Sequence, residues 1–189
     1  MRLFAALTPP EDVLEDLDAF LTPRREAAGF RWSVPEQWHL TLAFFAAVPE
    51  RRLDNLRERL GRAASRRTPM RLAVAGGGAF PHVGKAKVLW AGIQTDEHDG
   101  EELRRLVTGC RAAASRAGVE TQGNRFRPHL TLARIGHPIE TSSWVRLLDA
   151  YRGPSWSVAE VVLIASHLGE GPRRRPRYET IAQLPLGVG

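Results

Sequence analysis

The chain has little cysteine, almost no lysine and no long apolar segment. Its single cysteine, Cys110, has no second cysteine with which to form an internal disulfide, and this suits a reducing compartment. No apolar run approaches the roughly 20 residues that span a bilayer. The N-terminal segment becomes acidic within about a dozen residues, which is unlike a secretory signal peptide. We therefore expect a cytoplasmic protein that does not enter a membrane.

Basic residues outnumber acidic residues by 27 to 21, which gives a formal net charge of +6. Only Lys85 and Lys87 are lysines, and the other basic residues are arginines. This excess is compatible with a solvated surface and equally with attraction to polyanions such as RNA. A length of 189 residues, of which 43% are apolar, indicates one globular domain over residues 1–189, with room for two small lobes. We expect a monomer.

Strand-like and helix-like segments alternate along the chain. We expect strands at 2–7, 38–46, 70–80, 87–94, 129–135, 156–167 and 177–184. We expect helices at 11–28, 50–65, 101–117 and 142–151. Thr8 would cap the first helix, Gly118 would end the third, and the three glycines at 76–78 predict a bulge. Short turns join several strand pairs, so the pattern favours an α+β fold with mixed or antiparallel sheets.

One pentapeptide occurs twice in the sequence. His39-Leu40-Thr41-Leu42-Ala43 recurs unchanged 90 residues later (129 − 39) as His129-Leu130-Thr131-Leu132-Ala133. Both copies lie in predicted strands, and a predicted helix follows each copy. Because alternate residues of a strand share a face, each histidine projects with its threonine while the leucines point into the core. Two similar halves can bring the two polar faces together across a pseudo-two-fold axis.

Two imidazoles and two hydroxyls around one cleft match the needs of phosphodiester hydrolysis. One histidine can act as general base on water and the other as general acid on the leaving oxygen, because an imidazole titrates near neutral pH. The sequence does not choose between these two roles. The threonine hydroxyls can donate hydrogen bonds to the non-bridging phosphate oxygens. No histidine spacing indicates a helical zinc site, so we predict no metal.

Arg134 follows the second copy of the pentapeptide and is a candidate phosphate ligand. Its planar guanidinium can donate two parallel hydrogen bonds to one phosphate. Strict strand alternation places Arg134 on the face opposite His129, so this assignment requires a twist or a bulge between them. Phe44 occupies the corresponding position after the first copy. The predicted site is therefore asymmetric, as separate acid and base roles require.

At these residues the chain resembles the two-histidine phosphoesterase superfamily, which is defined by two His-x-Thr/Ser motifs. It is most similar to the bacterial and archaeal RNA 2′,3′-cyclic phosphodiesterases, which are also called 2′-5′ RNA ligases. The resemblance covers most of the chain and includes residues 2–7, 38–42, 88–92 and 126–134. The chain departs from the family pattern at 45–47, where Phe-Ala-Ala replaces an expected Leu-Gly, and this change concerns a turn more than the chemistry.

The resemblance implies two pseudo-symmetric lobes whose antiparallel sheets, flanked by helices, surround a central cleft. It implies metal-independent and cofactor-independent hydrolysis of the 2′,3′-cyclic phosphate at an RNA end to a terminal 2′-phosphate, with reversible 2′-5′ ligation at the same site. Carried over to this chain, His39 would donate a proton to the departing 3′ oxygen and His129 would accept a proton from water. Thr41, Thr131 and Arg134 would hold the phosphate.

Two other functions remain open. The same chemistry can act on a small cyclic nucleotide or a cyclic ADP-ribose phosphate, and the chain can instead be a non-catalytic RNA-binding module. The remaining histidines lack a threonine partner and are interpreted as structural or surface residues: His82, His98, His137 and His167. The basic run 173–175, with Arg177, can either contact RNA or be solvated. The five tryptophans can stack on bases, but we expect most of them to pack in the core. We expect Cys110 to pack in the core.

Overall fold

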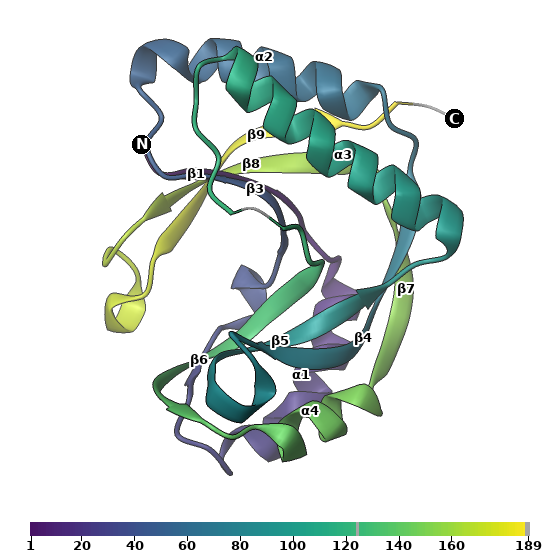
Figure 1. Ribbon diagram of the computed structural model, residues 1–189, viewed down its shortest axis with the longest axis vertical. Helices are drawn as coiled ribbons and strands as arrows, with labels where there is room; N and C mark the ends of the chain where they lie inside the picture. The colour runs from purple at the N-terminus through teal and green to yellow at the C-terminus, as the bar shows by residue number, and fades with distance from the viewer. Residues whose placement is uncertain (124, 188–189) are drawn as a thin grey trace.

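The computed structural model describes residues 1–123 and 125–187, and it shows a strongly curved antiparallel sheet with helices along its outside (Figure 1). The strand order is β7-β4-β5-β6-β3-β1-β8-β9, and β2 pairs with β6. The strands are β1 (Leu3–Leu7), β2 (Arg31–Trp32), β3 (Leu40–Phe45), β4 (Met70–Phe80), β5 (Ala86–Gln94), β6 (His129–Ile139), β7 (Arg152–Val158), β8 (Glu160–His167) and β9 (Arg177–Pro185). The helices are α1 (Glu11–Arg25), α2 (Glu50–Ser65), α3 (Glu97–Arg116) and α4 (Ser142–Asp149), with short 3-10 turns η1 (Pro35–Gln37), η2 (Val83–Lys85) and η3 (Pro172–Arg174). The predicted α+β class with antiparallel pairing is confirmed.

The sheet consists of two halves that meet at β3 and β6. The first half contains β3, β1, β8 and β9, and the second contains β6, β5, β4 and β7. The two halves are joined by the pairing of Leu40 with Leu130. Helices α2 and α3 lie side by side over the first half, and α1 and α4 lie over the second half (Figure 1). α1 follows β1, a strand of the first half, yet it packs against β7 of the second half. A segment that leaves the first half therefore covers the second half.

The four leucines of the repeated pentapeptide anchor the junction in the core. Leu40 and Leu42 are 1% exposed, and Leu130 and Leu132 are fully buried. They belong to one continuous apolar cluster with the inner faces of α2 and α3. Burying each leucine side chain stabilises the fold by roughly 2 kcal/mol. The alternation predicted for both motifs is therefore confirmed, and it leaves the polar residues of the motifs on the opposite, concave face.

One predicted strand, residues 156–167, is two strands in the structure. β7 pairs with β4 in the second half, whereas β8 pairs with β1 and β9 in the first half. The chain passes from one half of the sheet to the other at Ala159. A continuous run of strand-forming residues does not reveal such a change of partner, because the residues on both sides of the break favour the same extended backbone.

Several element ends also differ from the sequence-based expectations. α3 begins four residues earlier than predicted because the side chain of Asp96 caps it by accepting a hydrogen bond from the backbone N–H of Asp99. Thr8 is not the cap of α1, which begins after Pro10 without a side-chain cap. The bulge at the three glycines is confirmed, since the β4–β5 register shifts there and Gly76 has a φ of 72°.

Of the predicted domain 1–189, residues 124, 188 and 189 lie outside the described residues. In residues 1–123 and 125–187, no helix combines the length and the apolar character needed to cross a bilayer.

Candidate active site

A cleft of about 500 Å³ lies on the concave face of the sheet, where its two halves meet. Five of the residues that line it are those predicted for the site: His39, Thr41, His129, Thr131 and Arg134. The structure therefore brings together two motifs that are separated in the sequence. The charge of His129 also contributes to lowering the pKa of His39, in agreement with their proximity.

The pairing of β3 with β6 arranges the two motifs head to tail. Leu40 pairs with Leu130 in an antiparallel register. Counting one residue either way from this pair places His39 opposite Thr131 and Thr41 opposite His129. Residues that face each other across antiparallel strands project to the same side of the sheet. Each histidine is thus associated with the threonine of the other motif as well as with its own.

Each motif contains a β-bulge, and the bulge in the second motif allows Arg134 to face the cleft despite the alternation of the strand. On β6, Ala133 pairs with Leu89 but Thr131 pairs with Trp90, so two residues of β6 oppose one residue of β5. The extra residue shifts the alternation, and Arg134 reaches the same cleft as Thr131 instead of the opposite face.

The first motif contains the same bulge at the same place. Ala43 pairs with Ala5, and Thr41 pairs with Ala6. This shift brings Phe44, the counterpart of Arg134, into the cleft. The guanidinium of Arg2 lies 4.3 Å from the centre of the Phe44 ring. Both halves thus supply an arginine to the cleft. In the second half Arg134 itself follows the motif, and in the first half Arg2 packs by a cation–π contact on Phe44, which follows the motif there.

The same hydrogen bond orients both imidazoles. His39 Nδ1 lies 2.7 Å from the carbonyl oxygen of Gln37, and His129 Nδ1 lies 2.6 Å from that of Arg127. Because a carbonyl can only accept, each Nδ1 carries a proton and donates it. The neutral ring then has its lone pair on Nε2, which is the nitrogen left for a reaction.

Aromatic side chains hold the His39 ring in place. Phe4 stacks on it with a centroid separation of 4.5 Å, and Tyr178 meets it edge-on at 5.6 Å. Phe4 and Tyr178 also contact each other. The imidazole of His39 therefore has little freedom to turn away from the cleft.

The His129 ring is bracketed in a similar way. Phe80 meets it edge-on at 4.9 Å, and Trp90 lies at 5.8 Å. Gly78 makes room for Trp90, because a Cβ atom at position 78 would overlap the indole ring. An alanine at position 78 would thus displace Trp90 and loosen the support of His129.

Burial favours the neutral form of both histidines. It lowers the pKa of His39 to about 4, although the hydrogen bond to Gln37 opposes this effect. Burial also lowers the pKa of His129, against its hydrogen bond to Arg127. An anion in the cleft would favour the protonated forms and raise both pKa values. The site therefore has a physical reason to take up a proton when it binds a phosphate.

The cleft is strongly cationic. Four arginines line it, namely Arg2, Arg31, Arg134 and Arg175, and no carboxylate is found among the described residues that line it. The charges of Arg134 and Arg2 both act on the hydroxyl of Tyr178 and lower its pKa, although burial dominates and the pKa is raised overall. The hydroxyl of Tyr178 consequently stays protonated and can donate a hydrogen bond.

Sequence reasoning missed Arg2, Arg31 and the aromatic brackets, and it left the role of Arg175 open. Arg2 and Phe4 could have been found, since they alternate on one face of the opening strand. For the run 173–175 the sequence leaves RNA contact and solvation open, and the structure places Arg175 in the cleft while Arg173 and Arg174 are exposed. Arg31 lies in β2, which is too short to give a sequence pattern.

Most of the other candidate side chains do not line the cleft. His82, His98 and His137 are exposed, and His167 Nε2 lies 2.8 Å from Glu179 Oε2. Cys110 is fully buried, and burial raises its pKa to about 12, which leaves it an unreactive thiol. Trp32 lines the cleft, whereas Trp38, Trp90 and Trp156 are buried.

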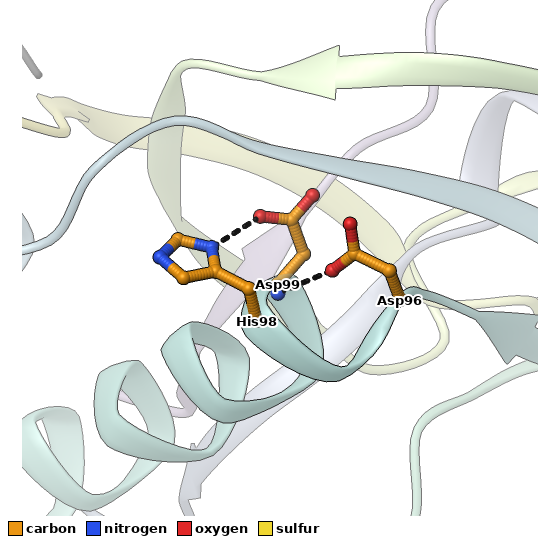
Figure 2. Close-up of side chains that lie close together, drawn as sticks. All are labelled: Asp96, His98 and Asp99. Atoms are coloured by element: carbon orange, nitrogen blue, oxygen red, sulfur yellow. Dashed lines mark hydrogen bonds and ion pairs between the residues drawn. The ribbon is translucent and has the colours of Figure 1, made fainter.

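One group of side chains in the described part of the chain has the composition of a metal site. Asp96, His98 and Asp99 place their ligand atoms within 4.8 Å of one another (Figure 2). Both carboxylates are already used, because Asp96 accepts a hydrogen bond from the N–H of Asp99 and Asp99 accepts one from the N–H of Arg71. This group caps α3, which accounts for its position, and nothing in it points to the cleft chemistry.

Two matched sheet halves that bring two His-x-Thr motifs into one cleft define the class of two-histidine phosphoesterases. The sequence model of the LigT-like phosphoesterase family matches residues 7–90 and 93–173, which include both motifs. The chain belongs to this family.

Relatives with established names support this placement. Over 187 residues, 97% of this chain, it is 30% identical to an RNA 2′,3′-cyclic phosphodiesterase of Geobacillus stearothermophilus, of which it spans 56% of the length. It is also 30% identical to the protein of that name from Thermus thermophilus, with 93% of this chain and 98% of the relative covered.

Solved structures share the fold over the whole chain. The crystal structure of the protein TT0787 of Thermus thermophilus has a TM-score of 0.80 at 29% identity and covers 100% of this chain and 99% of that one. The crystal structure of Escherichia coli LigT in apo form has a TM-score of 0.77 at 25% identity and covers 98% of this chain and 97% of that one.

Proposed function

We propose that the protein hydrolyses the 2′,3′-cyclic phosphate at the end of an RNA, with His39 and His129 as its acid and base. The observation that carries this proposal is that both imidazoles line one cationic cleft, where Nδ1 donates to a backbone carbonyl and Nε2 has no hydrogen-bond partner among the described residues. Relatives named RNA 2′,3′-cyclic phosphodiesterase indicate the substrate.

In this reaction a water oxygen attacks phosphorus while the bond from phosphorus to the 3′ oxygen breaks. His129 Nε2 accepts the proton of the water, and protonated His39 donates its Nε2 proton to the 3′ oxygen, which leaves a 2′-phosphate and a 3′-hydroxyl. The low pKa of His39 supports its role as the donor, because a weakly basic imidazole gives up its proton readily to an alkoxide. The same sequence of steps, with a 5′-hydroxyl in place of water as the nucleophile, would form a 2′-5′ linkage and leave a 3′-hydroxyl.

The geometry of the bulged strands supports three phosphate ligands. Thr41 and Thr131 would donate their hydroxyls to the non-bridging oxygens, and Arg134 would offer its guanidinium to the same phosphate. Binding the anion would also raise the pKa of His39, so that the acid becomes protonated only when the substrate is in place.

The test is product analysis on an oligonucleotide that ends in a 2′,3′-cyclic phosphate, with EDTA present. We expect a 2′-phosphate product, undiminished turnover in EDTA and a bell-shaped pH profile. His39→Ala and His129→Ala should each lower turnover by about 10³-fold or more. His137→Ala is the matched control, since this histidine is exposed and outside the cleft.

Three results would contradict the proposal: a 3′-phosphate product, normal turnover in either cleft variant, or loss of activity in EDTA that added metal restores. Salt-dependent RNA binding that persists in the double variant without any turnover by the parent protein would instead favour the RNA-binding module.

A further inference from the structure

The cleft carries more positive charge than a cyclic phosphate requires. A 2′,3′-cyclic phosphate has one negative charge, and under the proposed function Arg134 already faces it. We propose that Arg31 and Arg175 form a second site, which binds the phosphate on the 5′ side of the terminal nucleotide. The inference rests on the proposed function and deepens it: the substrate is an RNA end with this additional phosphate, and a nucleoside 2′,3′-cyclic phosphate is a poor substrate.

Arg31 is held directly opposite another arginine. In the antiparallel pair of β2 and β6 its register partner is Arg134. Like charges directly opposite each other on neighbouring strands are destabilising. Across the described residues neither guanidinium forms an ion pair, and no carboxylate lines the cleft. An anion in the cleft beside the two guanidiniums would remove this repulsion. A place where local stability is sacrificed is typical of a binding site.

Arg175 is brought to the same wall from a distant part of the chain. Its Nη2 donates a hydrogen bond of 2.9 Å to the carbonyl of Trp32, the residue after Arg31. On the same loop, the carbonyl of Pro176 accepts a hydrogen bond of 2.7 Å from Gln37 Nε2. These two bonds tie the loop between β8 and β9 to the segment around β2, and they fix the Arg175 guanidinium beside this strand.

The loop that carries Arg175 is strained. Arg173 and Arg174 have φ angles of 54° and 59°, in the left-handed region that residues with a Cβ seldom adopt. Such strain persists when the surrounding contacts impose it, and it is concentrated at ligand clamps and active sites. Arg173 and Arg174 directly precede Arg175. Their strained backbone conformation therefore helps to place Arg175 in the cleft.

The experiment compares kcat/KM on a nucleoside 2′,3′-cyclic phosphate, on the same compound with a 5′-phosphate, and on the corresponding dinucleotide with a normal linkage or an uncharged methylphosphonate linkage. We expect kcat/KM on both compounds with the additional charged phosphate to exceed that on the plain nucleoside compound by about tenfold or more. The reason is that charge-assisted hydrogen bonds from Arg31 and Arg175 to this phosphate would strengthen binding. The methylphosphonate dinucleotide should fall back to the level of the plain nucleoside compound.

Two variants assign the effect to residues. Arg31→Gln and Arg175→Gln should each lower the ratio of kcat/KM between the charged dinucleotide and the plain nucleoside compound by about tenfold. Arg66→Gln is the matched control, because it removes the same charge from the outer surface of the protein, and its ratio should equal that of the parent. Because the ratio is internal to each variant, a fraction of misfolded protein does not change it.

The outcomes separate this inference from the function on which it depends. No turnover on any of the four compounds would contradict the proposed function. Turnover that is equal on all four, or a methylphosphonate dinucleotide as good as the charged one, would overturn the second phosphate site alone. An unchanged ratio in both variants would also overturn it.

Discussion

Arginines line two hollows of this molecule, the cleft between the sheet halves and a groove between α2 and α3. The two hollows are of similar size, at about 550 Å³ for the groove and about 500 Å³ for the cleft. Seven arginines line the groove and four line the cleft. By number of cations the groove is the stronger candidate for an anion site, yet the histidines and threonines of the two motifs lie in the cleft.

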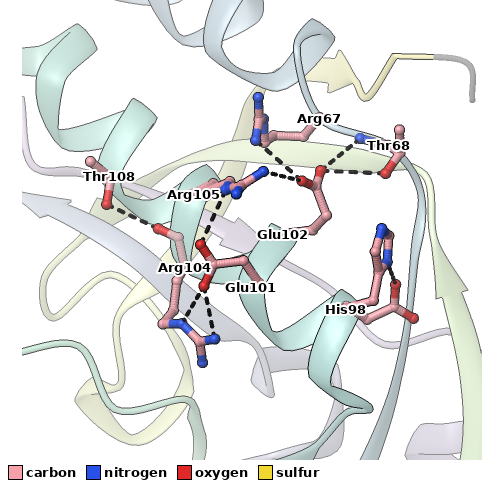
Figure 3. Close-up of polar contacts among 9 residues, drawn as sticks. Arg67, Thr68, His98, Glu101, Glu102, Arg104, Arg105 and Thr108 are labelled. Carbon is pink, nitrogen blue, oxygen red and sulfur yellow. Dashed lines mark hydrogen bonds and ion pairs between the residues drawn. The ribbon is translucent and has the colours of Figure 1, made fainter.

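The two hollows differ in how their charges are neutralised. In the groove, Glu101 binds Arg104 at 2.9 Å and Arg105 at 3.1 Å (Figure 3). Glu102 is 8% exposed, and it accepts from Arg67 at 3.2 Å and from the backbone N–H of Thr68 at 3.2 Å.

No such partner faces the four arginines of the cleft within the described chain. Four groove arginines, Arg62, Arg67, Arg104 and Arg105, thus have a carboxylate partner, whereas no cleft arginine has one among the described residues. The absence of any carboxylate beside the cleft arginines, rather than the number of arginines, therefore distinguishes the cleft. Four predictions test this distinction, in order of decreasing effect.

The largest effect is expected on turnover. Arg134→Ala should lower kcat/KM on a cyclic-phosphate oligonucleotide by about 10²- to 10³-fold, because a preorganised donor to the developing phosphate charge is lost. Arg66→Ala, in the groove, should leave the value within about twofold. Steady-state kinetics at one fixed salt concentration measure both, and similar losses in the two variants would show that the hollows do not differ in function.

The second effect is on stability in acid. Burial lowers the pKa of His39 to about 4 in the folded protein, against 6.5 for the unperturbed side chain. The folded state thus binds this proton less readily than the unfolded state, and the stability is complete above about pH 6.5 and falls as the pH decreases towards 4. The loss can reach about 3 kcal/mol. Urea unfolding between pH 7 and 4 measures it, and His39→Gln should have a shallower profile.

The groove should respond only at lower pH. Hydrogen bonds from Arg104, and then from Arg105, lower the pKa of Glu101 below its usual 4.5. The contribution of Glu101 is accordingly present above pH 4.5 and is lost as the pH falls below that value. If the parent and His39→Gln lose stability equally between pH 6.5 and 4.5, the acid-sensitive group is not His39.

The third effect concerns the buried carboxylate of Glu102, which pairs with Arg67 of the groove. Glu102→Gln should destabilise the protein by about 2 kcal/mol, since it removes the charge that compensates Arg67 in a largely buried place. Glu101→Gln is the control and should change the midpoint of unfolding little, because its ion pairs are exposed. Turnover per folded molecule should be unaffected in both variants. Lower turnover in a fully folded Glu102→Gln protein would connect the groove with catalysis.

The sequence predicts the placement of the motif residues because alternation and duplication are local signals. Leu40 and Leu130 are buried as expected, and the threonines lie on the concave face. The Arg134 assignment requires a bulge, but the sequence cannot place it, since a bulge depends on the partner strand and the pentapeptide itself contains no glycine.

What the sequence could not predict depends on contacts between distant segments. Arg175 enters the cleft only because its loop binds Trp32, which lies 143 residues away in the sequence. The brackets around the histidines come from β1, β4, β5 and β9, and their order in the sheet is not written in any local pattern. The break at Ala159 escapes the sequence for the same reason, because only the change of partner strand reveals it.

The smallest effect is a gain in stability on removal of a charged side chain. Arg31→Gln should stabilise the protein without ligand by about 0.5 kcal/mol, because it removes the repulsion between Arg31 and the opposite Arg134. Arg105→Gln in the groove should instead destabilise the protein slightly, since it breaks contacts with Glu101 and Glu102. Denaturant unfolding at low ionic strength measures both changes, and added salt should weaken them. A destabilised Arg31→Gln protein would mean that the guanidinium is held by a favourable contact within the fold. A stabilised one would show that unpaired charge in the cleft is kept at the expense of stability, as an anion-binding site requires.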